Sequence, residues 1–376
     1  VNISGEKTWD DANNQDGKRP TKITVILKKT VDGQTSEVKR QDVTPNSEGE
    51  WKYEFTNLPL YEDGKPIEYS IDEEKVAGYD KVTTRTTNGP DYNLTNKHEP
   101  ETVNISGEKT WDDNNNQDGK RPESITVKLM KQVEGGQPEV KETKVVTKGQ
   151  DDKWKYEFND LPKYEDGKLI TYSIDEEKVD GYDKVPSRTT NGPDYNLTNK
   201  HTPETVDVKG EKTWDDANNK DGKRPNKITV NLLSNGNKIQ TKDVTADATG
   251  RWLYSFKNLP KYDNQHKEIK YTVTEEAVAG YTAEINGLNI KNTHKTEKTN
   301  VSVSKKWVGK AASSAKIDLY ADGVKKDSVT LNQANQWKHT FTNLDKYKNG
   351  AEIKYTVKEE AIANYKTVVS GDMNSG

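Results

Sequence analysis

The chain repeats itself four times, and this internal similarity constrains the fold more than any other feature. The segment VNISGEKTWDDANNQDGKRP at Val1–Pro20 returns as VNISGEKTWDDNNNQDGKRP at Val103–Pro122 and as VDVKGEKTWDDANNKDGKRP at Val206–Pro225. A fourth, shortened opening, VSVSKKWVGK, begins at Val301. Self-similarity at a fixed period indicates a tandem array of one module rather than a single large domain. We place the modules at 1–101, 102–204, 205–297 and 298–376.

Each module consists of short runs in which apolar and polar residues alternate. In the first module these runs are KITVIL from Lys22, WKYEF from Trp51, YSIDEE from Tyr69 and YNLTN ending at Asn96. A period of two is typical of half-buried strands, and no segment shows a convincing helical period. Several short strands in roughly 100 residues predict an all-β fold, with one small β-sandwich per module. The connectors HEPETV, HTPETV and HKTEKT are short, so we expect the modules to stack as a semi-extended rod.

Composition excludes several classes of function. The 58 basic and 62 acidic residues are well mixed and leave a net charge of −4, which argues against nucleic acid and against an anionic membrane surface as partners. No apolar run is long enough to span a membrane. With no cysteine, neither disulfides nor thiolate metal sites are available. The first residues, VNISGEKTW, already belong to a repeat, so we expect the chain to be a piece of a longer protein.

One lysine in each opening run faces inward. Side chains of a strand alternate between its two faces, so Ile3, Lys7 and Trp9 share one face. Because Ile3 and Trp9 are apolar, this is the core face, and a lysine there is costly unless it is paired or neutral. The same alternation selects Lys109, Lys212 and Lys305, and it turns the neighbouring Lys306 outward.

One carboxylate and one amide join this lysine. In the YSIDEE run, Tyr69, Ile71 and Glu73 share a face, and in YNLTN, Tyr92, Leu94 and Asn96 do. The inward carboxylates are Glu73, Glu176, Glu275 and Glu359. The inward amides are Asn96, Asn199 and Asn292. Each of the first three modules therefore sends a Lys, a Glu and an Asn into an otherwise apolar interior.

Two interpretations of this set remain open from the residues alone. The first is a buried Lys–Glu ion pair with an Asn hydrogen bond, since buried charges are usually paired. The second is covalent: burial favours a neutral lysine and a protonated carboxylic acid, which can polarise the Asn carbonyl while the amine attacks. Ammonia would leave and an amide would remain. The three-fold recurrence on the same face favours the covalent interpretation.

These residues resemble the CnaB-type domains, the B-type repeats of Gram-positive cell-wall-anchored adhesins and pili. The resemblance covers essentially the whole chain and is carried by Lys-x-Trp with DDxNNxDGKRP, by the YxVxE strand and by the terminal LTN or IKN. It implies an Ig-like sandwich of reverse-Ig topology. It also implies isopeptide bonds between the first and last strands, assisted by the strand glutamate. The implied sets are Lys7–Asn96 with Glu73, Lys109–Asn199 with Glu176, and Lys212–Asn292 with Glu275.

The fourth module departs from this pattern. It holds Lys305 and Glu359, but no Φ-x-Φ-x-Asn run follows, and Asn374 lies in a polar stretch next to glycine. We therefore expect Lys305 to lack its bond, and the last strand to be absent or supplied by a partner chain.

The resemblance implies an extracellular, wall-anchored stalk that presents an adjacent adhesive domain of the same protein. We expect a monomer without a cofactor and without catalysis on external substrates. The alternative is that the repeats themselves bind a host matrix protein such as collagen.

Two further signals suggest metal binding only weakly. The loop with Asp10, Asp11, Asn13, Asn14 and Asp16 resembles a calcium loop, but the twelfth position counted from Asp11 is Lys22, where an EF-hand needs glutamate. We expect a solvated loop without metal, because Asp and Asn favour turns. The histidines His98, His201 and His294 lie one module apart, which argues against a shared metal site.

Overall fold

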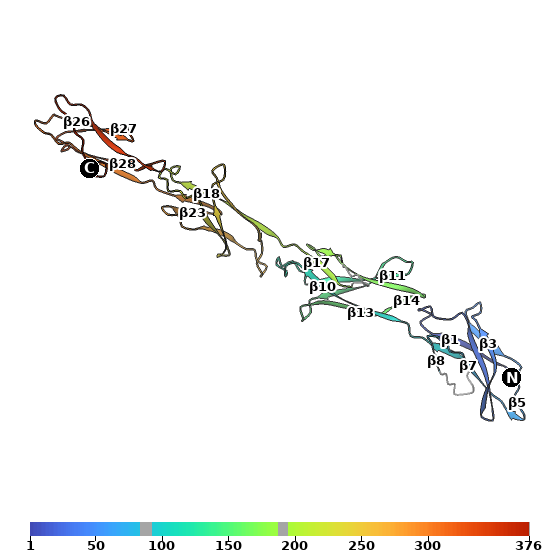
Figure 1. The fold of residues 1–376 in the computed structure, drawn as a ribbon. Coiled ribbons are helices and arrows are strands. Elements are labelled where there is room, and N and C mark those ends of the chain that lie inside the picture. Colours follow the sequence, from blue (N-terminus) through green and yellow to red (C-terminus); the bar gives the residue numbers. More distant parts are fainter. Residues whose placement is uncertain (83–91, 187–194, 376) are drawn as a thin grey trace. The chain divides into compact units, whose positions relative to one another are not determined.

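The computed structural model describes residues 1–82, 92–186 and 195–375, which fold into strands, turns and loops without a helix (Figure 1). The predicted all-β class is therefore confirmed. No helix in the described ranges could cross a membrane. The chain forms two compact units, Val1–Thr202 and Pro203–Gly376, and each unit holds two repeats.

The first repeat is a sandwich of two sheets with a short hairpin. One sheet has the order β4-β1-β9-β8 and the other has the order β3-β2-β7. The strands are β1 (Ile3–Asp10), β2 (Ile23–Val31), β3 (Gln34–Val43), β4 (Trp51–Phe55), β5 (Tyr61–Glu62), β6 (Lys65–Pro66), β7 (Glu68–Glu73), β8 (Asp80–Val82) and β9 (Leu94–Lys97).

The first and last strands of this repeat are parallel neighbours. β1 pairs antiparallel with β4 on one side and parallel with β9 on the other. In the parallel pair, Lys7 lies opposite Leu94 and Trp9 lies opposite Asn96. The chain therefore enters and leaves the repeat through two strands that are hydrogen-bonded to each other.

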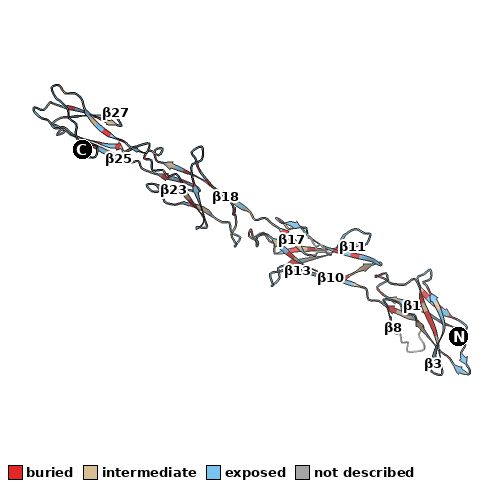
Figure 2. Ribbon diagram, viewed as in Figure 1, coloured by how far each residue is buried: buried red, intermediate tan, exposed pale blue. Residues whose placement is uncertain are grey.

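Apolar side chains from both sheets fill the space between them. Val25 and Leu27 of β2 pack with Trp51, Tyr53 and Phe55 of β4, and all five are buried (Figure 2). The half-buried strand predicted for the WKYEF run is thus confirmed in this repeat. Lys52, which stands between Trp51 and Tyr53 in this run, is exposed, as the alternation of strand side chains requires.

A glycine allows the two sheet neighbours of β1 to meet. Tyr53 donates its hydroxyl hydrogen bond to the carbonyl oxygen of Tyr92, passing the backbone of β1 at Gly5. A Cβ at Gly5 would lie 2.1 Å from that carbonyl oxygen. The absent side chain is what lets this tyrosine tie the last strand into the sheet.

Repeats 2 and 3 have the same arrangement. Their first sheets have the orders β13-β10-β17-β16 and β21-β18-β24-β23, with β10/β17 and β18/β24 as the parallel pairs. Their second sheets have the orders β12-β11-β15-β14 and β20-β19-β22. The strands of repeat 2 are β10 (Thr102–Asp112), β11 (Ser124–Val133), β12 (Glu139–Thr147), β13 (Trp154–Pro162), β14 (Tyr164–Glu165), β15 (Lys168–Glu176), β16 (Asp183–Val185) and β17 (Leu197–Lys200). Those of repeat 3 are β18 (Thr205–Asp215), β19 (Ile228–Ser234), β20 (Asn237–Val244), β21 (Trp252–Pro260), β22 (Tyr271–Glu275), β23 (Thr282–Asn286) and β24 (Asn289–Thr293).

Repeat 4 keeps one sheet and reduces the other. The sheet β27-β26-β31 is complete, whereas β25 pairs only with β28 among the described residues. The strands are β25 (Lys298–Ser304), β26 (Ala315–Ala321), β27 (Val324–Leu331), β28 (Lys338–Asp345), β29 (Tyr347–Lys348), β30 (Ala351–Glu352) and β31 (Tyr355–Glu359). β25 ends before Lys305, and Trp337 lies in a turn with φ of 60°, so neither residue belongs to a strand, unlike its counterparts in the other repeats.

Candidate cross-linking site

Three lysines are almost completely buried at equivalent places. Lys7 on β1, Lys109 on β10 and Lys212 on β18 expose only 2%, 1% and 2% of their surface. The prediction that these side chains face inward is confirmed by their burial. Lysine is rarely buried in this way without a partner.

Burial changes the protonation of these amines. It is the largest influence on Lys7 and lowers its pKa to about 8, although the Glu73 carboxylate acts in the opposite direction. Burial lowers the pKa of Lys109 and Lys212 as well. A lysine with a lowered pKa is neutral more often at physiological pH, and the neutral amine is the nucleophilic form.

A glutamate from the opposite sheet meets each lysine. Glu73 ends β7, and its Oε1 lies 3.1 Å from the Lys7 Nζ, without the alignment of a hydrogen bond. Lys212 Nζ lies 2.7 Å from Glu275 Oε1, and Lys109 contacts Glu176 in the same way. Lys and Glu thus span the interior of the sandwich between its two sheets.

The asparagine of the last strand contacts the same carboxylate in repeats 1 and 2. Asn96 and Asn199 donate from Nδ2 to the Oε2 of Glu73 and Glu176, each at 2.8 Å. The Oδ1 atoms of these asparagines, and both polar side-chain atoms of Asn292, have no hydrogen-bond partner among the described residues. A buried polar atom left unpaired costs about 1–3 kcal/mol of folding free energy. Stability alone therefore does not explain why these asparagines lie in the interior.

A tryptophan completes the site, although its apolar side chain alone predicts only a place in the core. The Lys7 Nζ lies 4.1 Å from the ring centroid of Trp9, and Trp9 packs edge-on against Trp51 and Tyr79. The same contact is 4.2 Å for Lys109 with Trp111 and 4.3 Å for Lys212 with Trp214. The constant Lys-x-Trp spacing could have predicted this contact between lysine and tryptophan, because residues two apart on a strand share a face.

The fourth repeat holds only part of the site. Lys305 Nζ lies 2.7 Å from Glu359 Oε2 and 4.4 Å from the Trp307 ring centroid, and the Lys305 side chain is 15% exposed. The other carboxylate oxygen of Glu359 accepts a hydrogen bond from the Thr367 hydroxyl at 2.7 Å. Asn374 is exposed, and no hydrogen bond in the described part of the chain joins it to Lys305 or Glu359.

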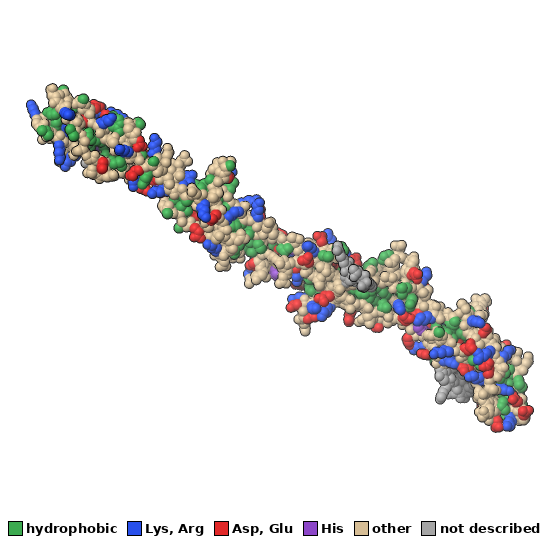
Figure 3. All heavy atoms as spheres, viewed as in Figure 1, with side chains coloured by type: hydrophobic (Ala, Val, Ile, Leu, Met, Phe, Trp, Pro, Cys, Tyr) green, Lys and Arg blue, Asp and Glu red, His purple; other side chains and the backbone are tan. Residues whose placement is uncertain are grey.

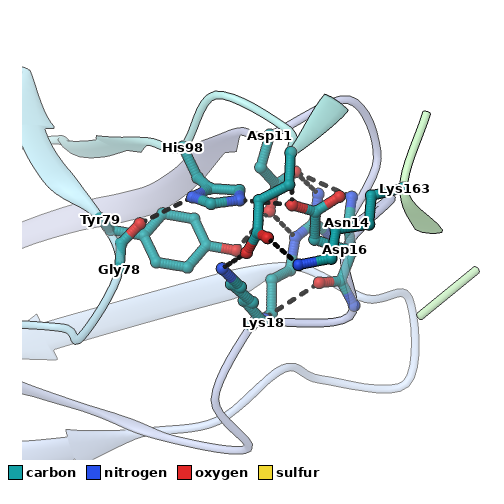
Figure 4. Close-up of polar contacts among 10 residues, drawn as sticks. Asp11, Asn14, Asp16, Lys18, Gly78, Tyr79, His98 and Lys163 are labelled. Atoms are coloured by element: carbon teal, nitrogen blue, oxygen red, sulfur yellow. Dashed lines mark hydrogen bonds and ion pairs between the residues drawn. The ribbon is translucent and has the colours of Figure 1, made fainter. Parts of the chain in front are cut away.

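The acidic loop is solvated only in part, which corrects the expectation from sequence: Asp10 and Asn13 are exposed, whereas Asp11 and Asp16 are buried. Asp11 is 2% exposed and accepts from Arg19 Nε at 2.7 Å and from the Tyr79 hydroxyl at 2.8 Å (Figure 4). Asp16 accepts from His98 Nε2 at 2.9 Å. Side chains of the protein itself thus occupy both carboxylates, and no cluster that could hold a metal occurs within the described residues.

The comparisons with known proteins agree with this architecture. The Cna protein B-type domain model matches residues 3–97, 105–200, 208–293 and 301–376, so the chain belongs to this family. It is 43% identical to the collagen adhesin of Staphylococcus aureus over 367 residues, which are 96% of this chain and 29% of that protein. The chain thus spans less than a third of this relative.

Two solved structures from the same organism are similar. The crystal structure of two B repeat units of the collagen-binding protein is 41% identical, covers 99% of this chain and 97% of that one, and has a TM-score of 0.45. A single B repeat unit is 45% identical, covers 46% of this chain and 95% of that one, and has a TM-score of 0.24.

Proposed function

We propose that this chain is a stalk segment of a bacterial surface adhesin, whose first three repeats cross-link themselves through Lys–Asn isopeptide bonds. The bonds join Lys7 to Asn96, Lys109 to Asn199, and Lys212 to Asn292. Glu73, Glu176 and Glu275 assist the reaction. The relationship to a collagen adhesin supports the surface role, and the chemistry is supported by the buried site.

The position of Glu73 between the two reacting groups carries this proposal. One carboxylate oxygen faces the Lys7 amine and the other accepts the hydrogen bond of the Asn96 amide nitrogen. A single acid therefore contacts both the nucleophile and the leaving group. An ion pair alone would not require the amide, whose oxygen is left unpaired.

The reaction balances within these three side chains. The neutral Lys7 Nζ attacks the Asn96 Cγ, and Glu73 shares its proton with the amide oxygen as the tetrahedral carbon forms. The carboxylate then takes a proton from the former amine nitrogen and passes it to Nδ2. The bond from Cγ to Nδ2 breaks, ammonia leaves, the amide oxygen returns its proton to Glu73 as the carbonyl re-forms, and an amide remains. Folding supplies the proximity that makes this reaction fast enough without an external catalyst.

The strand order gives the bond a mechanical use. Because the chain enters through β1 and leaves through β9, tension along the chain acts first on this parallel pair. A bond between Lys7 and Asn96 would carry that tension directly, and the residues between them would be shielded. The chemistry occurs once per repeat and consumes its own residues, so the chain does not act as an enzyme on other molecules.

The repeats' surface fits a spacer. Acidic and basic side chains are interspersed over the face seen in Figure 3. We therefore favour a spacer that is extracellular, wall-anchored and monomeric over repeats that themselves bind collagen, although a relative is called a collagen adhesin. Binding of the isolated chain to immobilised collagen would support the alternative.

Intact mass spectrometry of the purified chain tests the cross-links. The mass should lie below the sequence mass by three ammonia molecules, and Glu73→Gln should restore one of them. Glu74→Gln, which changes an exposed neighbour, is the matched control and should restore none. An unchanged mass of the parent chain would refute the cross-links, and a loss of four would refute the assignment of repeat 4.

A further inference from the structure

The acidic loop after the first strand has a role that the cross-links do not explain. In repeat 1 this loop comprises Asp11–Arg19, and its own contacts hold it in one shape. Asp11 accepts from the Arg19 guanidinium and the Asn14 backbone N–H, and Asn14 Oδ1 accepts from the Arg19 backbone N–H at 3.0 Å. The loop is therefore a preformed surface rather than an adaptable one.

The second carboxylate of the loop fixes the linker that leaves the repeat. Asp16 Oδ2 accepts from His98 Nε2 at 2.9 Å and from the backbone N–H of Glu101 at 2.8 Å (Figure 4). The other ring nitrogen of His98 lies 2.8 Å from the Gly78 carbonyl oxygen. His98 thus joins Asp16 of the loop to the turn at Gly78.

The loop and linker together contact the hairpin tip of repeat 2, within the same compact unit. The Gly167 N–H donates to the Gln15 carbonyl at 3.0 Å. The Glu101 carboxylate receives Lys18 from repeat 1 and Lys163 from repeat 2, the latter at 2.7 Å. One linker carboxylate thus joins a cation from each repeat.

Two glycines meet at the centre of this contact. A Cβ on Gly17 would lie 2.6 Å from the Gly167 Cα, and a Cβ on Gly167 would lie 3.1 Å from the Gly17 Cα. No side chain fits between the two backbones. The surface therefore selects a hairpin that carries glycine at this position.

The second compact unit shows the same joint with different residues. The Gly350 N–H donates to the Lys220 carbonyl at 3.0 Å, and a Cβ on Gly222 would lie 2.6 Å from the Gly350 Cα. Glu297 lies between Lys223 of repeat 3 and Lys346 of repeat 4, at 3.4 and 3.2 Å. Both compact units thus show the same geometry, between the acidic loop of their first repeat and a glycine at the hairpin tip of their second.

We propose that the DDxNNxDGKR loop and the linker glutamate form a docking surface for the next repeat, which holds the two repeats in one fixed orientation and requires glycine at the tip of the incoming hairpin. The partner is another repeat of this chain. The proposal does not depend on the isopeptide bonds.

Distance distributions between two spin labels on the full chain test this docking. The chain has no cysteine, so Val38→Cys on β3 and Val145→Cys on β12 place one label on an exposed strand position in each repeat. In the parent, double electron–electron resonance should give one narrow peak. Gly167→Ala should abolish the narrow peak. Glu101→Gln should broaden it to a smaller extent.

Gly64→Ala is the matched control. Gly64 occupies the same hairpin turn in repeat 1, with φ of +78° against +75° at Gly167, but nothing lies within 4 Å of a Cβ there. It carries the same backbone strain without the contact, so the narrow peak should persist. A narrow peak in Gly167→Ala, or equal broadening in Gly64→Ala, would overturn the proposal.

Discussion

Asn96 in β9 lies opposite Trp9 in β1, two residues beyond Lys7 on the same face of the strand. The lysine must therefore extend along its own strand, over the Trp9 ring, to approach the amide. Lysine has the flexible four-carbon stem that this diagonal approach needs. The same ring is approached by Arg19 of the acidic loop, whose guanidinium carbon lies 5.9 Å from the ring centroid.

Asn96→Ala removes the cross-link but keeps the Lys7–Glu73 pair. By analogy with a disulfide that closes a loop of this size, the free energy of unfolding of repeat 1 should fall by about 4–5 kcal/mol. Chemical denaturation monitored by hydrogen exchange of repeat 1 peptides measures this loss. In a Glu73→Gln background the bond is already blocked, so the same substitution should cost far less. Equal costs in both backgrounds would show that the asparagine stabilises the repeat without a bond.

The unlinked Lys7 should make stability depend on pH. In the Asn96→Ala chain, the Lys7 pKa of about 8 lies below the ordinary value of 10.5. Between these values the unfolded chain binds more protons than the folded chain. The free energy of unfolding should therefore rise with pH by at most about 1.4 kcal/mol per pH unit, and this gain is lost as the pH falls through 8. Denaturation at pH 8 and 9.5 measures it, and adding Lys7→Met should remove the difference.

His294, at the joint between repeats 3 and 4, should lose its proton at a higher pH than an ordinary histidine. The hydrogen bond to Asp221 raises the pKa of His294 above its ordinary value of 6.5, with a smaller contribution from Glu297. The charged ring therefore stabilises the folded joint fully below pH 6.5, and this contribution is lost as the pH rises through the elevated pKa. Nuclear magnetic resonance of the ring protons gives the midpoint. Asp221→Asn should lower it, whereas Asp243→Asn, at an exposed carboxylate, should not.

Gly5→Ala should damage both the fold and the cross-link of repeat 1. The added Cβ would lie 2.1 Å from the Tyr92 carbonyl oxygen and 2.6 Å from the Tyr53 hydroxyl, so β9 must move away from β1. Overpacking of this kind costs about 1–3 kcal/mol. Mass spectrometry should also find a fraction of chains that retain one more ammonia. Gly33→Ala, where nothing lies within 4 Å of the added carbon, should leave the cross-link yield unchanged.

The sequence predicted the strands and their inward faces because both follow from local alternation. Lys7, Glu73 and Asn96 are each buried as the period of two requires. The loop was predicted less well. Asp11 and Asp16 are turn-forming residues, and Ala12, Asn13 and Asn14 do adopt positive φ, but the two carboxylates are buried by partners that alternation does not reveal.

The repeated segments and their alternating residues are enough to predict that four copies of one β-module follow each other, and which side chains of each strand point inward. Local alternation does not predict that Glu73 meets Lys7 from the opposite sheet, that the Lys7 amine lies over the Trp9 ring, or that His98 and Glu101 donate to Asp16. The physical reason is that facing depends on neighbours two residues apart. Contact between distant strands depends on sheet order and register, which the core and the turns fix together.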